Sequence, residues 1–186
     1  MSKQRPVIAV LVGSLSKDSI NRKLARALEK LAGQRAEFRF VRMDDLPVYN
    51  RDMDSSYPPA YNRLKEDIHS ADAVLFVTPE NNRSVPSVLK NAIDIASRPW
   101  GTNSFAGKPG AVIGASTGAI STALAQQHLR NICVFVDVYM LAQPEAFVRY
   151  HDGLIAEDAS VTDDSVREFL SKFVDSYLAW VARLSN

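Results

Sequence analysis

A polar segment at residues 13–21 concentrates groups that bind anions. It carries four hydroxyl or amide side chains: Ser14, Ser16, Ser19 and Asn21. An apolar run precedes it and a helical pattern follows, so free backbone N–H groups and the positive end of a helix dipole converge there. We therefore expect an anion site, with phosphate as the anion. A structural alternative stays open, because Ser19 or Asp18 could simply cap the helix.

The same segment excludes several familiar chemistries. Its single glycine, Gly13, rules out the dinucleotide fingerprint Gly-x-Gly-x-x-Gly, and the absence of Gly-Lys-Ser/Thr rules out a triphosphate P-loop. Ser14 does not stand in Gly-x-Ser-x-Gly, which argues against a hydrolase. The three histidines have no metal-ligand spacing. We predict no metal site.

Two further polar segments follow apolar runs. Residues 78–86 come after the run 73–77, and residues 115–119 come after the run 111–114. In an open parallel sheet, ligands bind beyond the carboxyl ends of the strands. We therefore expect the three segments to meet at one edge, although each could also serve only to cap the helix after it.

The chain alternates between strand and helix patterns. Strands are predicted at 7–12, 38–43, 73–77, 111–114 and 132–136, with a partly paired segment near 140–143. Helices are predicted at 20–32, 60–69, from Pro86 to about Arg98, at 120–129, and from about 162 onward. Unbroken apolar strands alternating with helices indicate a parallel sheet covered on both faces. The expected fold is a flavodoxin-like α/β three-layer sandwich, with five strands in the order 2-1-3-4-5.

Composition limits the possible partners. The 186 residues carry a net charge of +1, with no basic block that would favour nucleic acid. No apolar run approaches the ~20 residues of a membrane span. Cys133 is the only cysteine and lies in an apolar run, which predicts a buried thiol and no disulfide. We expect a single cytoplasmic domain over residues 1–186, with residues 44–59 long enough to form a binding loop.

Four segments together resemble one known family. They are Gly13-Ser14-Leu15 with Ser19 and Asn21, then Leu46-Pro47-Val48-Tyr49-Asn50, then Thr78-Pro79-Glu80 with Asn82-Arg83-Ser84, then Leu89-Lys90-Asn91-Ala92-Ile93-Asp94. In this order and spacing they resemble the NADPH-dependent FMN reductases, whose members include flavodoxin-like quinone, chromate and azo-dye reductases. The resemblance covers nearly the whole chain.

The resemblance implies an enzyme that passes a hydride from NADPH or NADH through FMN to a small-molecule acceptor, such as a quinone, flavin, azo compound or chromate. It implies that the flavin carries the chemistry, so no catalytic side chain is expected. It also implies a homodimer or homotetramer. The flavin phosphate would contact the first segment, through Ser14, Ser16, Lys17, Ser19 and Asn21. The flavin ring and ribityl chain would lie along Pro79, Glu80, Asn81, Asn82 and Arg83. Another edge would be closed by Ser116, Thr117 and Gly118.

Two positions depart from the family pattern. Ser16 stands where many relatives have a phosphate-binding arginine, and Asn81 stands where relatives usually have a tyrosine near the ring. Loss of the charged contact and of the aromatic packing predicts weaker FMN binding in a more open site. Two alternatives keep the fold without the reductase activity: an electron carrier, which the net charge of +1 disfavours, and a non-catalytic sensor of FMN or a small anion.

Overall fold

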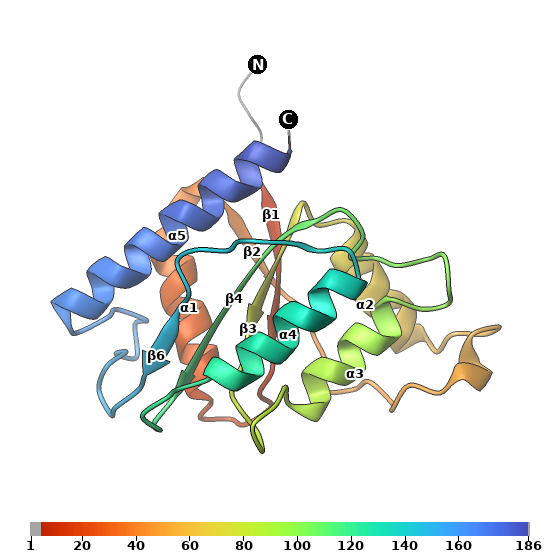
Figure 1. The fold of residues 1–186 in the computed structure, drawn as a ribbon, viewed down its shortest axis with the longest axis horizontal. Helices are drawn as coiled ribbons and strands as arrows, with labels where there is room; N and C mark the ends of the chain where they lie inside the picture. The colour runs from red at the N-terminus through yellow and green to blue at the C-terminus, as the bar shows by residue number, and fades with distance from the viewer. Residues whose placement is uncertain (1–4, 186) are drawn as a thin grey trace.

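A parallel sheet forms the middle layer of the computed structural model, which describes residues 5–185 (Figure 1). Its strands are β1 (Val7–Val12), β2 (Glu37–Phe40), β3 (Ala73–Val77), β4 (Pro109–Ser116), β5 (Tyr139–Met140) and β6 (Phe147–Arg149). Their order is β2-β1-β3-β4-β5, and β6 also pairs with β4. The predicted order 2-1-3-4-5 is confirmed, and a sixth strand is added to it.

Helices cover both faces of this sheet. On one face lie α1 (Ile20–Ala32) and α5 (Asp164–Leu184), and on the other lie α2 (Pro59–His69), α3 (Ser87–Ala96) and α4 (Ala123–Phe135). Short 3₁₀ helices occupy Gly33–Arg35 and Arg51–Met53. Each face has its own apolar core, because consecutive residues of β1 and β3 point alternately into the two layers. Within residues 5–185, none of the helices combines the length and hydropathy needed to span a bilayer.

The central strands end side by side. Val12 pairs with Val77, and Val77 pairs with Ile113. Two backbone hydrogen bonds of 2.9 Å extend this alignment into the loops, from Gly13 N to Val77 O and from Thr78 N to Ile113 O. The loops that follow β1, β3 and β4 therefore begin at one edge of the sheet, as the sequence predicts.

The predicted strand at 132–136 is wrong. These residues form the last turns of α4, which runs to Phe135 rather than ending near 129. A short apolar run fits a buried helix segment as well as a strand, and periodicity alone does not separate the two. The fifth position of the sheet is instead shared: β5 pairs with Pro109 and Gly110, and β6 pairs with the end of β4.

Cys133 lies on the buried side of α4, as predicted. Burial raises the pKa of its thiol to about 12, so the side chain stays protonated at neutral pH. The smaller differences are in boundaries. For example, β2 spans Glu37–Phe40 rather than 38–43.

The long loop at residues 44–59 is held against α3. Asn91 accepts a hydrogen bond from Tyr49 N at 2.8 Å and donates one to Pro47 O at 2.9 Å. The Tyr49 hydroxyl donates to Asp54 at 3.0 Å. One amide on α3 therefore fixes the backbone of a loop more than forty positions away in the chain.

Gly114 in β4 lies where the strand closely approaches the end of β3 and the start of α4, and a substitution there tests this approach. A Cβ at this position would collide with the Thr78 carbonyl oxygen and with the Thr122 side chain. We expect Gly114→Ala to lower the free energy of unfolding by about 2–3 kcal/mol, measured by urea denaturation. Gly118→Ala is the matched control, because the nearest atom to its Cβ would be Ser116 Oγ at 3.6 Å. Equal effects of the two substitutions would contradict the close approach at Gly114.

Candidate functional site

The loop after β1 presents a row of unpaired donors. The backbone N–H groups of Leu15, Ser16, Lys17 and Asp18 form no hydrogen bond with another described residue. The hydroxyls of Ser14 and Ser16 are also free of partners in the described chain. These groups surround the N-terminus of α1, where the helix dipole adds positive potential. The loop therefore has the donor set that an anion such as a phosphate requires.

Ser19 and Asn21 hold this loop in place. The Ser19 hydroxyl accepts a hydrogen bond from Arg22 N at 3.2 Å, so Ser19 is the N-cap of α1. The buried Asn21 amide donates to Ala115 O and accepts from Ala115 N, both at 2.9 Å. The capping alternative is thus confirmed for Ser19, and Asn21 joins the start of α1 to the end of β4. Contact of either side chain with a phosphate stays a prediction.

The loop after β3 contains a tight hairpin. Asn81 and Ser84 exchange two backbone hydrogen bonds, Asn81 N to Ser84 O at 3.1 Å and Ser84 N to Asn81 O at 2.9 Å. Between them, Asn82 and Arg83 have φ values of +50° and +64°. Such left-handed backbone is unfavourable for residues with a Cβ and recurs at functional sites. The exposed side chains of Asn82 and Arg83 are carried at the tip of this turn.

Glu80 attaches the hairpin to α4. Its carboxylate accepts hydrogen bonds from Leu124 N at 3.0 Å and Ala125 N at 3.1 Å. Thr122, the N-cap of α4, makes no capping bond of its own, so Glu80 supplies the cap from another loop. A second link joins Ser84 Oγ and His128 Nδ1 at 3.0 Å. Pro79, which precedes Glu80, packs near Gly13 of the first loop.

The loop after β4 completes this edge of the sheet. Ser116 Oγ accepts a hydrogen bond from Gly118 N at 3.2 Å, and Thr117 and Gly118 are exposed. Ser121 Oγ donates to Val148 O at 2.8 Å, which ties the loop to β6. The thirteen predicted site residues therefore lie on, or directly at the ends of, three loops that start from neighbouring strand ends (Figure 1); Asn21 is already in α1 and Ser116 still in β4.

Comparison with known proteins agrees with this geometry. The family model of the NADPH-dependent FMN reductases matches residues 6–152. The chain belongs to this family. A 2-hydroxy-1,4-benzoquinone reductase from a Burkholderia species is 48% identical over 174 residues, covering 94% of this chain and 95% of that protein. A quinone reductase from Pseudomonas putida is 47% identical over 175 residues, covering 94% of each chain.

A solved structure supports the same assignment. A flavoenzyme NAD(P)H:(acceptor) oxidoreductase from Paracoccus denitrificans is 48% identical and superposes with a TM-score of 0.93. The match covers 96% of this chain and 98% of that one. The predictions of an oxidoreductase, of FMN and NAD(P)H as cofactors, and of a small-molecule acceptor are therefore confirmed.

The residues of this chain fit an FMN reductase. The loop from Leu15 to Asp18 offers several N–H donors and the two serine hydroxyls to a phosphate dianion. A cation, Lys17, follows directly after Ser16, the position at which many relatives have an arginine. The exposed side chains of Asn82, Arg83 and Thr117 form no hydrogen bond with another residue of the described chain and are available to the rest of a cofactor.

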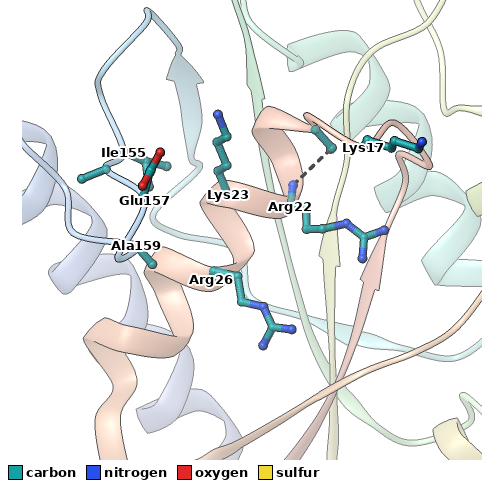
Figure 2. A pocket seen from close by; sticks show the side chains of 9 residues that line it. Lys17, Arg22, Lys23, Arg26, Ile155, Glu157 and Ala159 are labelled. Carbon is teal, nitrogen blue, oxygen red and sulfur yellow. Dashed lines mark hydrogen bonds between the residues drawn. The ribbon is translucent and has the colours of Figure 1, made fainter.

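Sequence reasoning missed the cations on the flank of α1. Arg22, Lys23 and Arg26 line a cavity of about 240 Å³ together with Lys17 and the segment at residues 155–159 (Figure 2). No block of basic residues marks these cations in the sequence. Their spacing on the first turns of a helix that has no acidic residue in its first turn is the signal that could have identified them.

Substitutions of Glu80 distinguish two roles of this side chain: capping α4, which affects stability, and contacting the cofactor, which affects FMN affinity alone. We expect Glu80→Ala to lower the free energy of unfolding by about 1–2 kcal/mol, because two N–H groups of α4 lose their acceptor. FMN affinity should fall in parallel, because the hairpin loses its attachment. Glu80→Gln, which keeps one acceptor oxygen, should lose less of both, measured by urea denaturation and by quenching of FMN fluorescence. Weaker FMN binding with unchanged stability would show instead that Glu80 touches the cofactor.

A substitution at Ser16 tests whether an arginine at this position would strengthen FMN binding. We expect Ser16→Arg to tighten FMN binding about tenfold to a hundredfold, because a charge-assisted hydrogen bond to the phosphate is added. Ser16→Met is the control, since it adds a side chain of similar length without charge. The dissociation constants come from titrating each apoprotein into FMN. Equal affinities of the two variants would mean that the position does not reach the phosphate.

Proposed function

We propose that this protein is an FMN-dependent NAD(P)H:quinone oxidoreductase. The observation that carries the proposal is the row of unpaired donors from Leu15 to Asp18 at the start of α1, beside the loops after β3 and β4. Two relatives named as quinone reductases, at 48% and 47% identity, support a quinone as the acceptor. Bound FMN would supply the hydride and electron chemistry, and this reaction would then require no nucleophile or metal from the chain.

The first task of the chain is to hold the cofactor. Ser14, Ser16, Lys17 and the backbone of the first loop would bind the phosphate through neutral donors and one cation. The second task is to fix the flavin environment. The position of the hairpin that carries Asn82 and Arg83 is restrained, because Glu80 and Ser84 form hydrogen bonds with α4. Backbone and amide donors held in this way would stabilise negative charge that develops during reduction.

We expect Asn81 to determine how much room is left for the electron acceptor beside the flavin ring. The resemblance places a tyrosine of relatives at this position, and asparagine occupies less volume and offers an amide instead. The Asn81 side chain is exposed and forms no side-chain hydrogen bond with another described residue. We propose that NAD(P)H and the quinone use the same open space in turn, which predicts ping-pong kinetics.

The assembly and location form part of the proposal. We propose a homodimer or homotetramer acting in the cytoplasm, with residues 1–186 working as one domain. Three of the large apolar side chains that are exposed support self-association: Trp100 at 79%, Val134 at 79% and Phe135 at 68%. The rings of Trp100 and Phe135 lie 6.4 Å apart, so two of the three form one patch.

One experiment tests cofactor and reaction together. The purified protein is saturated with FMN and given NADPH or NADH without oxygen. We expect the yellow flavin absorbance to bleach and to return when a benzoquinone is added. Initial rates with both substrates varied should give parallel double-reciprocal lines, because the two substrates occupy the site in turn.

The alternatives predict other outcomes. A protein that binds FMN but is not reduced by either nucleotide would be a sensor. A flavin that is reduced by a partner protein but not by NAD(P)H would indicate an electron carrier. Intersecting lines would contradict the shared space for donor and acceptor. A protein that never gains flavin absorbance would overturn the proposal itself.

A further inference from the structure

A serine and a histidine meet where the hairpin after β3 contacts α4. Ser84 Oγ and His128 Nδ1 lie 3.0 Å apart. Ser84 closes the hairpin opposite Asn81, the residue that we place beside the acceptor space. His128 lies one turn further along α4 than the two N–H groups that Glu80 binds. The hairpin therefore contacts the same flank of α4 at two successive turns, and the second contact contains a group that can carry a proton.

The hydrogen bond between the two side chains leaves one donor free. A histidine that carries protons on both ring nitrogens donates from each of them, and Ser84 Oγ can accept from Nδ1. The Ser84 hydroxyl forms no other hydrogen bond with a described residue, so its own proton is free for a third group. Ser84 is half-buried and His128 is exposed. The pair therefore forms a short path for a proton, from solvent through the imidazole to a hydroxyl on the hairpin.

Few charges surround this path. The charged or titratable side chains on the segments next to this part of α4 are Glu80 and Arg83 on the hairpin, Lys90 and Asp94 on α3, Arg130 on α4 itself, Tyr139 on β5 and Glu145 after β5. Glu80 is held by backbone N–H groups. Lys90 and Asp94 pair with each other at 2.8 Å. No carboxylate of the described chain pairs with His128, so this residue can release a proton without breaking an ion pair.

Reduction of a quinone requires a proton source. A quinone that accepts a hydride equivalent, delivered from NAD(P)H through bound FMN, becomes a hydroquinone monoanion. One proton on its oxyanion completes the hydroquinone. Histidine is the side chain that most often exchanges protons near neutral pH. A Ser–His pair on the hairpin that borders the acceptor space has the chemistry for this last step.

We propose that Ser84 gives this proton to the hydroquinone oxyanion and that His128 replaces it. The Ser84 O–H bond breaks, a new O–H bond forms on the hydroquinone, and the Nδ1 proton of the imidazolium moves to Ser84 Oγ. The imidazole is left neutral and, because His128 is exposed, regains its proton from solvent. The inference rests on the proposed function, because it assigns a residue pair to the second half of that reaction.

Rapid kinetics of the two half-reactions test the pair. For His128→Gln, we expect FMN reduction by NAD(P)H to stay within about twofold of the wild type and reoxidation by benzoquinone to slow about a hundredfold. Wild-type reoxidation should slow as the pH rises over about 5–8, because the imidazolium is lost, and the variant should lack this dependence. His69→Gln is the matched control, since His69 is an exposed histidine at the end of α2, just before β3 begins rather than where it ends.

Ferricyanide separates proton transfer from damage to the flavin site. This acceptor takes electrons without a proton, so it should reoxidise the reduced flavin of His128→Gln as fast as that of the wild type. Ser84→Ala should match His128→Gln with both acceptors, and the double variant should be no slower than either single one, because the two residues act in one path. Ser84→Thr keeps the hydroxyl and should retain most of the quinone rate.

A binding measurement tests the pair without turnover. 4-Nitrophenolate carries an oxyanion like that of the hydroquinone monoanion, and it is titrated into the FMN-saturated protein by calorimetry at about pH 6.5, where part of a histidine population is protonated. We expect His128→Gln to weaken its binding about tenfold, because a charge-assisted donor to the oxyanion is lost. His69→Gln should bind it as the wild type does.

The outcomes separate this inference from the proposed function. A wild type that reduces quinones, with variants that reoxidise equally fast, would overturn the inference and leave the reductase proposal intact. Equal slowing with benzoquinone and ferricyanide would give the pair a structural role only and would also overturn it. A wild type that is reduced by NAD(P)H and reoxidised by ferricyanide, but by no quinone, would overturn the proposed acceptor itself.

Discussion

The contact between Asn21 and the backbone of Ala115 organises this edge of the molecule. One buried amide meets both the N–H and the C=O of a residue 94 positions away, at 2.9 Å each. It brings the N-terminus of α1, with its unpaired donors, against the end of β4. Without it, two backbone groups would be buried unpaired, which costs far more than an ordinary hydrogen bond contributes. The position of the first loop relative to the third therefore depends on a side chain that need not touch any ligand.

A similar role belongs to Glu80 on the other side of the site. Its carboxylate satisfies two N–H groups of α4 and so converts a surface hairpin into part of the helical layer. The left-handed backbone of Asn82 and Arg83 is unfavourable by itself and persists because the surrounding bonds determine it. Both anchors place polar groups in advance of binding. A cofactor held by such groups loses little free energy to reorganisation of the protein.

Local patterns were sufficient for most of the fold. The runs 7–12 and 73–77 are continuous and apolar because both faces of these central strands are buried, and the structure has the same bounds. The fifth position of the sheet could not be predicted, because β5 and β6 span only two and three residues and leave no readable period. The apolar run at 132–136 was therefore predicted as the fifth strand, although most of it belongs to α4. The three loops were predictable as polar breaks after apolar runs, but the partners of Asn21 and Glu80 lie 94 and 44 or more positions away and leave no local trace.

The distribution of positive charge around α1 connects these observations. The loop has Ser16 where many relatives have an arginine, so it lacks a fixed cation at that position. Arg22 and Lys23 lie on the flank of α1 and form no ion pair with another described residue. A flexible or flanking cation raises the local positive potential and speeds the approach of an anion, but it does not supply the paired hydrogen bonds of an arginine fork. The field that attracts phosphates is therefore retained near the first loop, whereas the geometry that would hold the flavin phosphate most tightly is not. In such a site the flavin phosphate would depend mainly on the backbone donors from Leu15 to Asp18.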